Sequence, residues 1–191
     1  MSKIILLNGC GSSGKTTIAK AIQHLSHEPW LHAGVDDIIA LMPSRFIEFG
    51  DKADEGYYKF VSKKDKRGDT IEIECTERGS KVFDMLPKFV KQLADLGENV
   101  TIDEVLVGKS QKDIYFETLK HHKIYFIGVY CDLEVMKSRE VLRKNRHQGL
   151  SNAQFDVVHK NYENIYDLTV DTTNTPPFEL ANKILDFVNQ N

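Results

Sequence analysis

Residues 9–16 have the types and the spacing of a phosphate-binding loop. They read GCGSSGKT and fit the pattern G-x-x-x-x-G-K-[ST]. In this pattern glycines let backbone N–H groups turn toward an anion, the lysine reaches the outer phosphates and the final hydroxyl binds Mg²⁺. The apolar run 4–7 precedes the loop and the amphipathic run 17–25 follows it. A strand, this loop and a helix are therefore predicted, with ATP or GTP bound where the helix N-terminus attracts anions.

The predicted nucleotide-binding residues lie in this loop and in the first turn of its helix. They are Gly9, Gly11, Ser12, Ser13, Gly14, Lys15, Thr16 and Thr17. Two of them have a further predicted role: Lys15 acts in catalysis on the transferred phosphate, and Thr16 is a ligand of Mg²⁺.

Carboxylates follow two of the other predicted strands. Asp36 and Asp37 come directly after the strand predicted at 30–35, and Asp103 lies near the end of the strand predicted at 99–104. Open parallel sheets bind ligands at this edge. We expect one of the two neighbouring aspartates to cap the next helix and the other to face the nucleotide. Asp103 is interpreted as a group that holds the Mg²⁺ shell or a water, or orients the substrate; the alternative is a carboxylate that only caps the strand.

A charged helix predicted at 133–146 carries arginines on one face. Arg139, Arg143 and Arg146 are separated by four and three residues, which places their guanidinium groups on the same side. A solvated charged face is the plain interpretation. Because phosphoryl transfer spreads negative charge over the γ-phosphate, we favour a lid that closes over the site and supplies countercharge, with 147–151 as its hinge.

Strands separated by helices along the whole chain predict one α/β domain with a parallel sheet. The segment 44–78 is polar and interrupts this order, and alternation at 55–61 and 69–74 predicts a β-hairpin insertion. The basic residues between these runs are interpreted as a solvated hairpin tip rather than a nucleic-acid patch. A helix is expected over 82–96 with a kink at Pro87.

Three other residues have structural interpretations. Ser151 is expected to cap the helix that follows the hinge. His159 is interpreted as a surface or structural histidine rather than a catalytic base, and Cys10 as a spacer in the phosphate loop rather than an oxidation sensor.

The composition is that of a globular domain and gives no reason to expect a nucleic acid or a membrane as partner. The chain has 191 residues, a net charge of -3 and 28% charged residues, and no apolar run approaches the length of a membrane span. The three cysteines lack metal-ligand spacing, which favours reduced thiols. The N-terminal residues lack the pattern of a signal peptide, so a cytoplasmic protein is expected.

Several short motifs, taken in order, resemble the chloramphenicol phosphotransferase-like family of P-loop small-molecule kinases. The motifs are LNG at 7–9, SSGK at 12–15, EPWL at 28–31, GVD at 34–36, ID at 102–103, GV at 128–129, CD at 131–132, RE at 139–140 with Arg143, VVH at 157–159, YD at 166–167 and VDTT at 170–173. The EPWL motif is far more specific than a P-loop, and the resemblance covers most of the chain.

The resemblance implies a fold similar to shikimate and adenylate kinases. This fold is a five-stranded parallel sheet flanked by helices, in a single domain 1–191 with an arginine-bearing lid at about 133–152 and a hairpin-like insertion at about 44–78.

The same resemblance assigns roles to single residues. Asp36 matches the general base that takes the proton of the substrate hydroxyl. The match also assigns phosphate contact to Lys15 and Mg²⁺ contact to Thr16. Arg139 and Arg143 match lid arginines that act in catalysis, the first of them also in nucleotide binding. The adenine is expected beside Asp171, Thr172 and Thr173.

An ATP- and Mg²⁺-dependent kinase of a small-molecule hydroxyl is the leading hypothesis, with chloramphenicol or a related aromatic alcohol as acceptor. The segment 44–78 departs from the family, which uses this neighbourhood for the acceptor pocket, so the acceptor stays open. One alternative is a nucleotide-binding regulatory or interaction module without turnover, suggested by the long charged hairpin. Another is a kinase of a different acceptor such as a nucleotide sugar, against which the EPWL motif argues.

Overall fold

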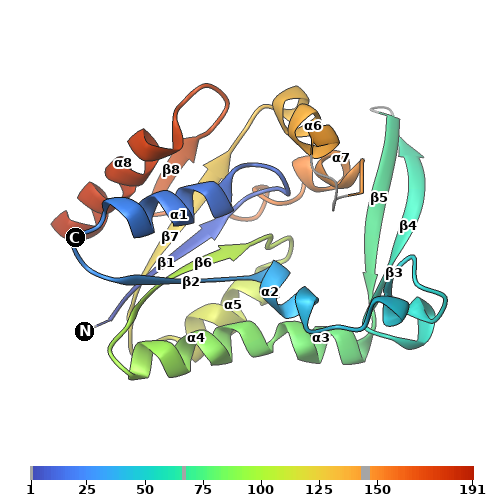
Figure 1. Cartoon of the computed structure of the whole chain (residues 1–191), viewed down its shortest axis with the longest axis horizontal. Coiled ribbons are helices and arrows are strands. Elements are labelled where there is room, and N and C mark those ends of the chain that lie inside the picture. The colour runs from blue at the N-terminus through green and yellow to red at the C-terminus, as the bar shows by residue number, and fades with distance from the viewer. Residues whose placement is uncertain (1, 66–67, 143–146) are drawn as a thin grey trace.

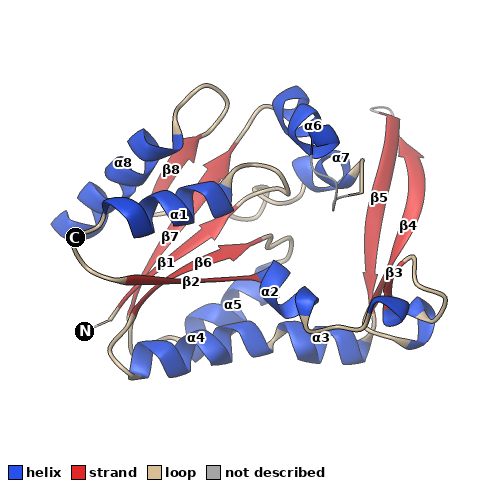
Figure 2. Cartoon of the chain, viewed as in Figure 1, coloured by secondary structure: helices blue, strands red, loops and turns tan. Residues whose placement is uncertain are grey.

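A five-stranded parallel sheet forms the body of the protein (Figures 1 and 2). The computed structural model describes residues 2–65, 68–142 and 147–191. The strands of the main sheet are β1 (Lys3–Asn8), β2 (Trp30–Gly34), β6 (Asn99–Glu104), β7 (Lys123–Tyr130) and β8 (Leu168–Asp171). They pair in the order β2-β6-β1-β7-β8 and all four pairings are parallel. The predicted parallel α/β sheet is confirmed.

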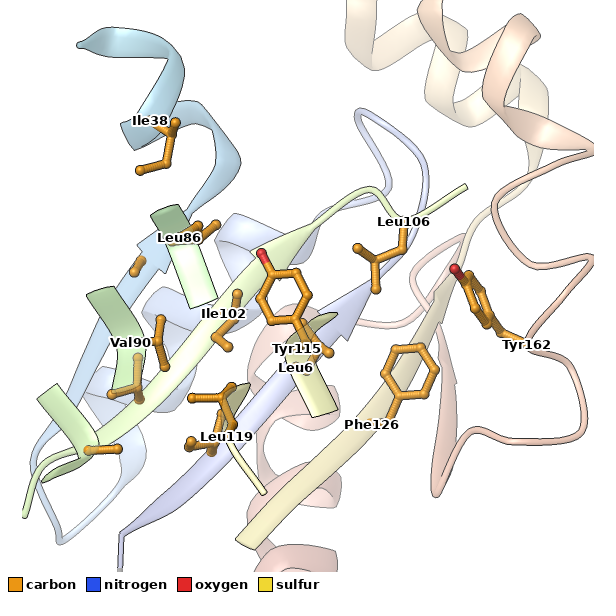
Figure 3. Close-up of a cluster of buried hydrophobic side chains, with 14 of the residues drawn as sticks. Leu6, Ile38, Leu86, Val90, Ile102, Leu106, Tyr115, Leu119, Phe126 and Tyr162 are labelled. Carbon is orange, nitrogen blue, oxygen red and sulfur yellow. The ribbon is translucent and has the colours of Figure 1, made fainter. Parts of the chain in front are cut away.

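Helices cover both faces of this sheet. On one face lie α1 (Lys15–Leu25) and α8 (Pro177–Gln190), and on the other lie α4 (Met85–Asp95) and α5 (Lys109–Thr118). Side chains alternate between the two faces of a strand. Leu7 of β1 therefore packs in the core under α1 and α8, whereas Leu6 packs with the α4 and α5 side chains shown in Figure 3.

The strand register brings the predicted site residues to one edge of the sheet. Asp103 of β6 lies opposite Leu7 of β1 on one side and Gly34 of β2 on the other. The phosphate loop leaves β1 at this edge, and α2 (Val35–Ala40) begins directly after β2. Asp36, Asp103 and the loop therefore meet where parallel sheets bind their ligands.

The insertion forms a second, three-stranded sheet beside the body (Figure 1). Its elements are the 3-10 turns Ser44–Phe46 and Ala53–Glu55 and the strands β3 (Ile47–Glu48), β4 (Tyr58–Asp65) and β5 (Gly68–Cys75). Strands β4 and β5 pair antiparallel with Tyr58 opposite Cys75, so the predicted hairpin is confirmed, with longer strands than expected. The sequence did not predict β3, which has only two residues and pairs parallel with β4.

The single kinked helix expected over 82–96 was wrong. Two helices occupy this part of the chain, α3 (Glu77–Phe83) and α4, and the break between them is at Asp84. Pro87 lies in the first turn of α4, where its missing N–H would have no intrahelical partner, so it causes no kink. Helix α3 begins earlier than expected because the Thr76 hydroxyl accepts the N–H of Gly79 at 3.0 Å and caps it.

The remaining helices lie after β7. Helix α6 spans Leu133–Leu142 and α7 spans Leu150–Phe155; the part of the predicted helix at 143–146 lies outside the described residues. Within the described ranges, no helix combines the length and the apolar character needed to cross a membrane.

Replacing Ile102 with alanine is expected to destabilise the domain strongly. This side chain is fully buried between the sheet and α4 (Figure 3). The substitution removes apolar contacts and leaves a cavity, and together these lower the free energy of unfolding by about 2–5 kcal/mol. Urea denaturation measures the effect. The control is Leu96→Ala, because Leu96 is 78% exposed and its loss should change stability by less than about 0.5 kcal/mol. Equal losses in the two variants would contradict this account of the core.

Candidate active site

The P-loop places unpaired polar groups around the N-terminus of α1. Ser12 and Gly14 have positive φ angles of 63° and 93°, a conformation that glycine adopts readily and serine does not. The hydroxyls of Ser12 and Ser13 are buried and make no hydrogen bond with any described residue. Buried polar groups without a partner indicate a ligand or water, and these lie at a helix N-terminus, where anions bind. The loop therefore fits a phosphate group.

Lys15 is held inside this loop. Its ammonium donates to the carbonyl oxygens of Gly9 and Cys10 at 3.0 and 2.9 Å, and it is 5% exposed. Burial raises the pKa of the Cys10 thiol to about 11, which disfavours the reactive thiolate and agrees with its interpretation as a spacer.

Thr16 and Asp103, the two predicted metal ligands, are in direct contact. The Thr16 hydroxyl donates to Asp103 Oδ2, and Lys15 Nζ lies 3.6 Å from Asp103 Oδ1. Nearby, His32 Nε2 is 3.9 Å from the Asp103 carboxylate and has no hydrogen-bond partner among the described residues.

This donor set fits Mg²⁺ that also binds phosphates and water. One hydroxyl and one carboxylate are hard oxygen ligands, and Mg²⁺ in nucleotide sites takes only one or two carboxylates from the protein. In the described part of the chain no cluster of three or more His, Cys, Asp or Glu residues forms a complete metal cage.

Arg139 joins α6 to the P-loop and to the loop after β8. Its guanidinium donates to the side chain and the carbonyl of Thr172 at 3.1 and 2.8 Å, and the Thr172 hydroxyl donates to the carbonyl of Ser13 at 2.6 Å. Asp171 and Thr173 form the turn around it, since Asp171 Oδ1 accepts the N–H of Thr173 at 2.7 Å. Arg143 and Arg146, predicted on the same face, lie outside the described residues.

A cavity of about 360 Å³ opens beside these residues. It is lined by Ser12, Gly14, Thr17, Ile18, Arg139, Leu142, Thr172, Thr175 and Pro177. The lining combines the P-loop with the loop after β8, which is where the adenine was expected.

The two aspartates after β2 have different environments. Asp37 Oδ2 accepts the N–H of Gly34 at 2.7 Å and so caps α2. Asp36 is exposed at the second position of the helix. Burial and the Glu48 carboxylate raise the pKa of Tyr58 above its usual value, and the charge of Asp36 adds to the rise.

The region between α6 and α7 depends on a buried carboxylate that the sequence analysis missed. Glu140 is 2% exposed and accepts the N–H groups of Gly149 and Ser151 at 3.1 and 2.8 Å. The expected Ser151 cap was wrong: Gly149, with φ of 101°, precedes α7 and occupies the cap position. The one signal for Glu140 was its position four residues after the buried Met136, on the inner face of α6.

Helix α7 touches the P-loop directly, which the sequence analysis also missed. Gln154 Oε1 accepts the N–H of Gly11 at 2.6 Å. Nothing in the spacing of the sequence links these residues, because 143 positions separate them.

His159 is a structural residue, as interpreted. It is buried, its Nδ1 lies 2.8 Å from the Tyr166 hydroxyl, and its ring stacks on Tyr130 with centroids 3.9 Å apart. The Tyr166 hydroxyl also accepts from Asn8 at 2.8 Å. This network supports the end of β1, from which the P-loop departs.

Two solved kinases have a fold similar to that of this chain. A sugar kinase from Janibacter sp. HTCC2649 superposes with a TM-score of 0.67 at 19% identity, covering 99% of this chain and 95% of that one. A shikimate kinase from Acinetobacter baumannii gives a TM-score of 0.59 at 16% identity, covering 100% and 94%. These likenesses show that the chain has the fold of P-loop kinases.

Sequence comparison defines the family. A Mycobacterium tuberculosis (strain H37Rv) protein provisionally named an O-phosphotransferase is 30% identical over 186 residues, which are 95% of this chain and 80% of that protein. The profile described as chloramphenicol phosphotransferase-like protein matches residues 2–189. The chain therefore belongs to the chloramphenicol phosphotransferase-like family of kinase-type phosphotransferases, and the resemblance found in its motifs is confirmed.

Acid is expected to destabilise the protein partly through His159. Burial, with a smaller effect of the Lys15 charge, lowers the pKa of His159 to about 4. The unfolded chain, with a histidine pKa near 6.5, binds the proton first as pH falls. The contribution of neutral His159 to the free energy of unfolding is therefore complete above about pH 6.5. It is lost as the pH falls toward 4, and the loss is at most about 3 kcal/mol.

Urea unfolding of wild type and of His159→Phe between pH 7.5 and pH 4 measures this contribution. Phenylalanine keeps an aromatic ring against Tyr130 but does not titrate, so the stability of the variant should fall less steeply with pH. Parallel pH profiles would contradict the assignment.

Proposed function

We propose that the protein transfers the γ-phosphate of ATP to a hydroxyl group of a small molecule, with Asp36 as the general base. The position of the two aspartates after β2 carries this proposal. Asp37 is bonded to Gly34 and fixes the start of α2, and Asp36, the residue before it, is exposed near the sheet edge that bears the P-loop. The acceptor oxygen attacks the γ-phosphorus, the bond to the β-phosphate oxygen breaks, and Asp36 takes the hydroxyl proton as ADP leaves.

The P-loop residues are proposed to bind the phosphates of the nucleotide. The support is the pair of buried unpartnered hydroxyls of Ser12 and Ser13 beside the N-terminus of α1. Lys15 is proposed to leave the carbonyl groups of Gly9 and Cys10 and neutralise charge on the outer phosphates.

Thr16 and Asp103 are proposed to hold Mg²⁺, which when bound neutralises phosphate charge during transfer. Their support is the contact between hydroxyl and carboxylate described above. Lys15, 3.6 Å from Asp103, keeps that carboxylate oriented toward the loop.

The arginines are proposed to supply positive charge from the lid. Arg139 lies beside the P-loop carbonyl of Ser12 and holds Thr172 in the wall of the cavity, where it would position the nucleotide. Arg143 is proposed to stabilise charge on the transferred group, on the strength of its sequence position alone.

The acceptor is proposed to be an alcohol of the chloramphenicol type, bound between Asp36 and the insertion. Family membership supports this. A panel of chloramphenicol, other aromatic alcohols, simple metabolite alcohols and nucleotide sugars, assayed by ADP release with Mg²⁺-ATP, tests it. If no member of the panel is phosphorylated, the proposal fails and a nucleotide-dependent regulatory role becomes the better account.

Asp36→Asn is expected to lower kcat by about 10²–10⁴, the usual contribution of a general base, while the Kd for ATP changes less than about twofold because the proposed phosphate-binding groups of the P-loop are all retained. Coupled ADP release and calorimetric ATP titration measure the two quantities. Asp37→Asn is the matched control, since its amide oxygen can still accept the N–H of Gly34. Unchanged turnover in Asp36→Asn would refute the assignment of the base.

Removing the metal ligands is expected to weaken divalent-cation binding. Thr16→Val keeps the side-chain shape but removes the hydroxyl that contacts Asp103, and Asp103→Asn removes the charge. Each should raise the Kd for Mn²⁺, measured by electron paramagnetic resonance with ADP present, by at least about tenfold, a loss seen even for outer-shell partners. Thr16→Ser retains the hydroxyl and should bind normally. A wild-type Kd in Thr16→Val would show that the metal lies elsewhere.

A further inference from the structure

His147, in the segment between α6 and α7, is received by an aromatic and acidic socket on the insertion. We define the socket as Glu48, Phe49 and Phe60. His147 packs at right angles against both phenylalanine rings, with centroids 4.9 and 5.2 Å apart, and those two rings pack edge to face with each other at 5.5 Å. Its Nε2 lies 3.2 Å from Glu48 Oε2. One side chain of the lid is thus held by three side chains of the insertion.

The backbone of the socket is strained at the residue that binds His147. Glu48 has φ of 58°, and a non-glycine residue in this left-handed region persists only where the surroundings enforce it. The carboxylate of Glu48 is held on its other side by the buried Tyr58, whose hydroxyl donates to the second Glu48 oxygen at 3.3 Å. Strained backbone of this kind is common at ligand-binding and switch regions, so the conformation of Glu48 suggests a functional role as well as a packing role.

A second set of bonds joins the same two parts of the chain. The carbonyl of Gly149 accepts the N–H of Ile71 at 3.3 Å, and the Asn152 side chain donates to the carbonyl of Asp69 at 2.9 Å. A Cβ atom at position 149 would lie 2.9 Å from that same Asp69 oxygen. Helix α7 therefore lies against the upper part of β5, as Figure 1 shows.

These contacts connect the two ends of the reaction. On the insertion side, Tyr58 links Glu48 to the neighbourhood of Asp36. On the lid side, Glu140 ties Gly149 to Ser151, and Gln154 at the other end of α7 accepts the N–H of Gly11. A series of contacts thus runs from Tyr58 through Glu48 and His147 to α7 and the P-loop, and the charge of Asp36 acts on Tyr58 at the other end.

We propose that His147 and Glu48 are positioning residues that lock the lid to the insertion and so determine acceptor binding. The inference rests on the proposed function for its kinetic consequence. With His147 in the socket, the insertion and α7 move as one body, and the hydroxyl of the acceptor is held at Asp36 with water excluded. Without this contact the P-loop still binds ATP, but the acceptor is held loosely and water competes for the phosphoryl group.

Four variants separate the parts of the contact. His147→Phe keeps a ring between the phenylalanines and loses the bond to Glu48, and His147→Ala loses both. Glu48→Gln removes the charge. Glu48→Gly removes the side chain and also relieves the positive φ, which offsets part of the stability lost with the bonds to His147 and Tyr58. His121→Ala is the control, because His121 is an exposed histidine in the turn before β7.

Hydrogen exchange on the free protein tests the contact without needing turnover. In His147→Ala and Glu48→Gly, exchange should speed up roughly tenfold in α7 and in residues 69–72, as expected for the loss of a charge-assisted hydrogen bond. The N–H groups of β1 and β6 should be unaffected. Unchanged exchange in α7 in both variants would overturn the proposal.

Steady-state kinetics with an acceptor found in the panel test the positioning role. The KM for the acceptor should rise about tenfold and the ratio of ATP hydrolysis to transfer should increase, while the KM for ATP stays within about twofold. The acceptor KM of His147→Phe should fall between those of wild type and His147→Ala.

Faster exchange with an unaltered acceptor KM would overturn the positioning role and leave a contact that only stabilises the fold. A wild-type enzyme without any transfer would instead refute the proposed function, and the exchange experiment would still decide whether the lid is locked.

Discussion

The contact of Asp103 with the first turn of α1 is the interaction on which the rest of the site depends. A carboxylate and an ammonium removed from water are stable only when each is paired and hydrogen-bonded, and here Asp103 meets both Thr16 and Lys15. The pairing requires β6 to lie between β1 and β2 in the register that sets Asp103 opposite Leu7 and Gly34. A slip of one residue would turn the carboxylate to the opposite face of the sheet. The register of the sheet therefore determines whether Lys15 and Thr16 of the P-loop have a carboxylate partner.

Features that depend on local pattern could be predicted from the sequence. The P-loop, the strands at 4–7, 30–35 and 99–104 and the hairpin each follow from spacing within about ten residues, and the structure has them all. The prediction of one helix with a kink at Pro87 was wrong because the sequence pattern did not reveal where α3 begins. Thr76 and Gly79 set that start, and Gly79 is required because a Cβ atom there would lie 1.8 Å from the carbonyl oxygen of Tyr57, a residue of the insertion.

The contacts of the lid could not be predicted, because they join residues that no spacing connects. Gln154 and Gly11 are 143 positions apart, and His147 and Glu48 are 99 apart. The sequence could place two aspartates after β2 and state that one would cap the helix, but only the bond from Gly34 shows that Asp37 does so. The type of a residue limits the interactions that its side chain can make. The partner with which it makes them is determined by the packing of segments that are far apart in the sequence.

Phosphates and the proposed acceptor are recognised by different kinds of groups. Phosphate binding uses backbone N–H groups and a helix N-terminus, which any sequence that folds this way supplies. The proposed acceptor would be bound by side chains instead, and the insertion is the proposed source of those side chains. Tyr58 connects the two parts: its ring packs in the core beside Phe83, 5.9 Å between centroids, and its hydroxyl reaches Glu48. One buried tyrosine thus packs the insertion against the core of the main sheet, so exposed side chains of β4 and β5 can change while the phosphate loop keeps its geometry.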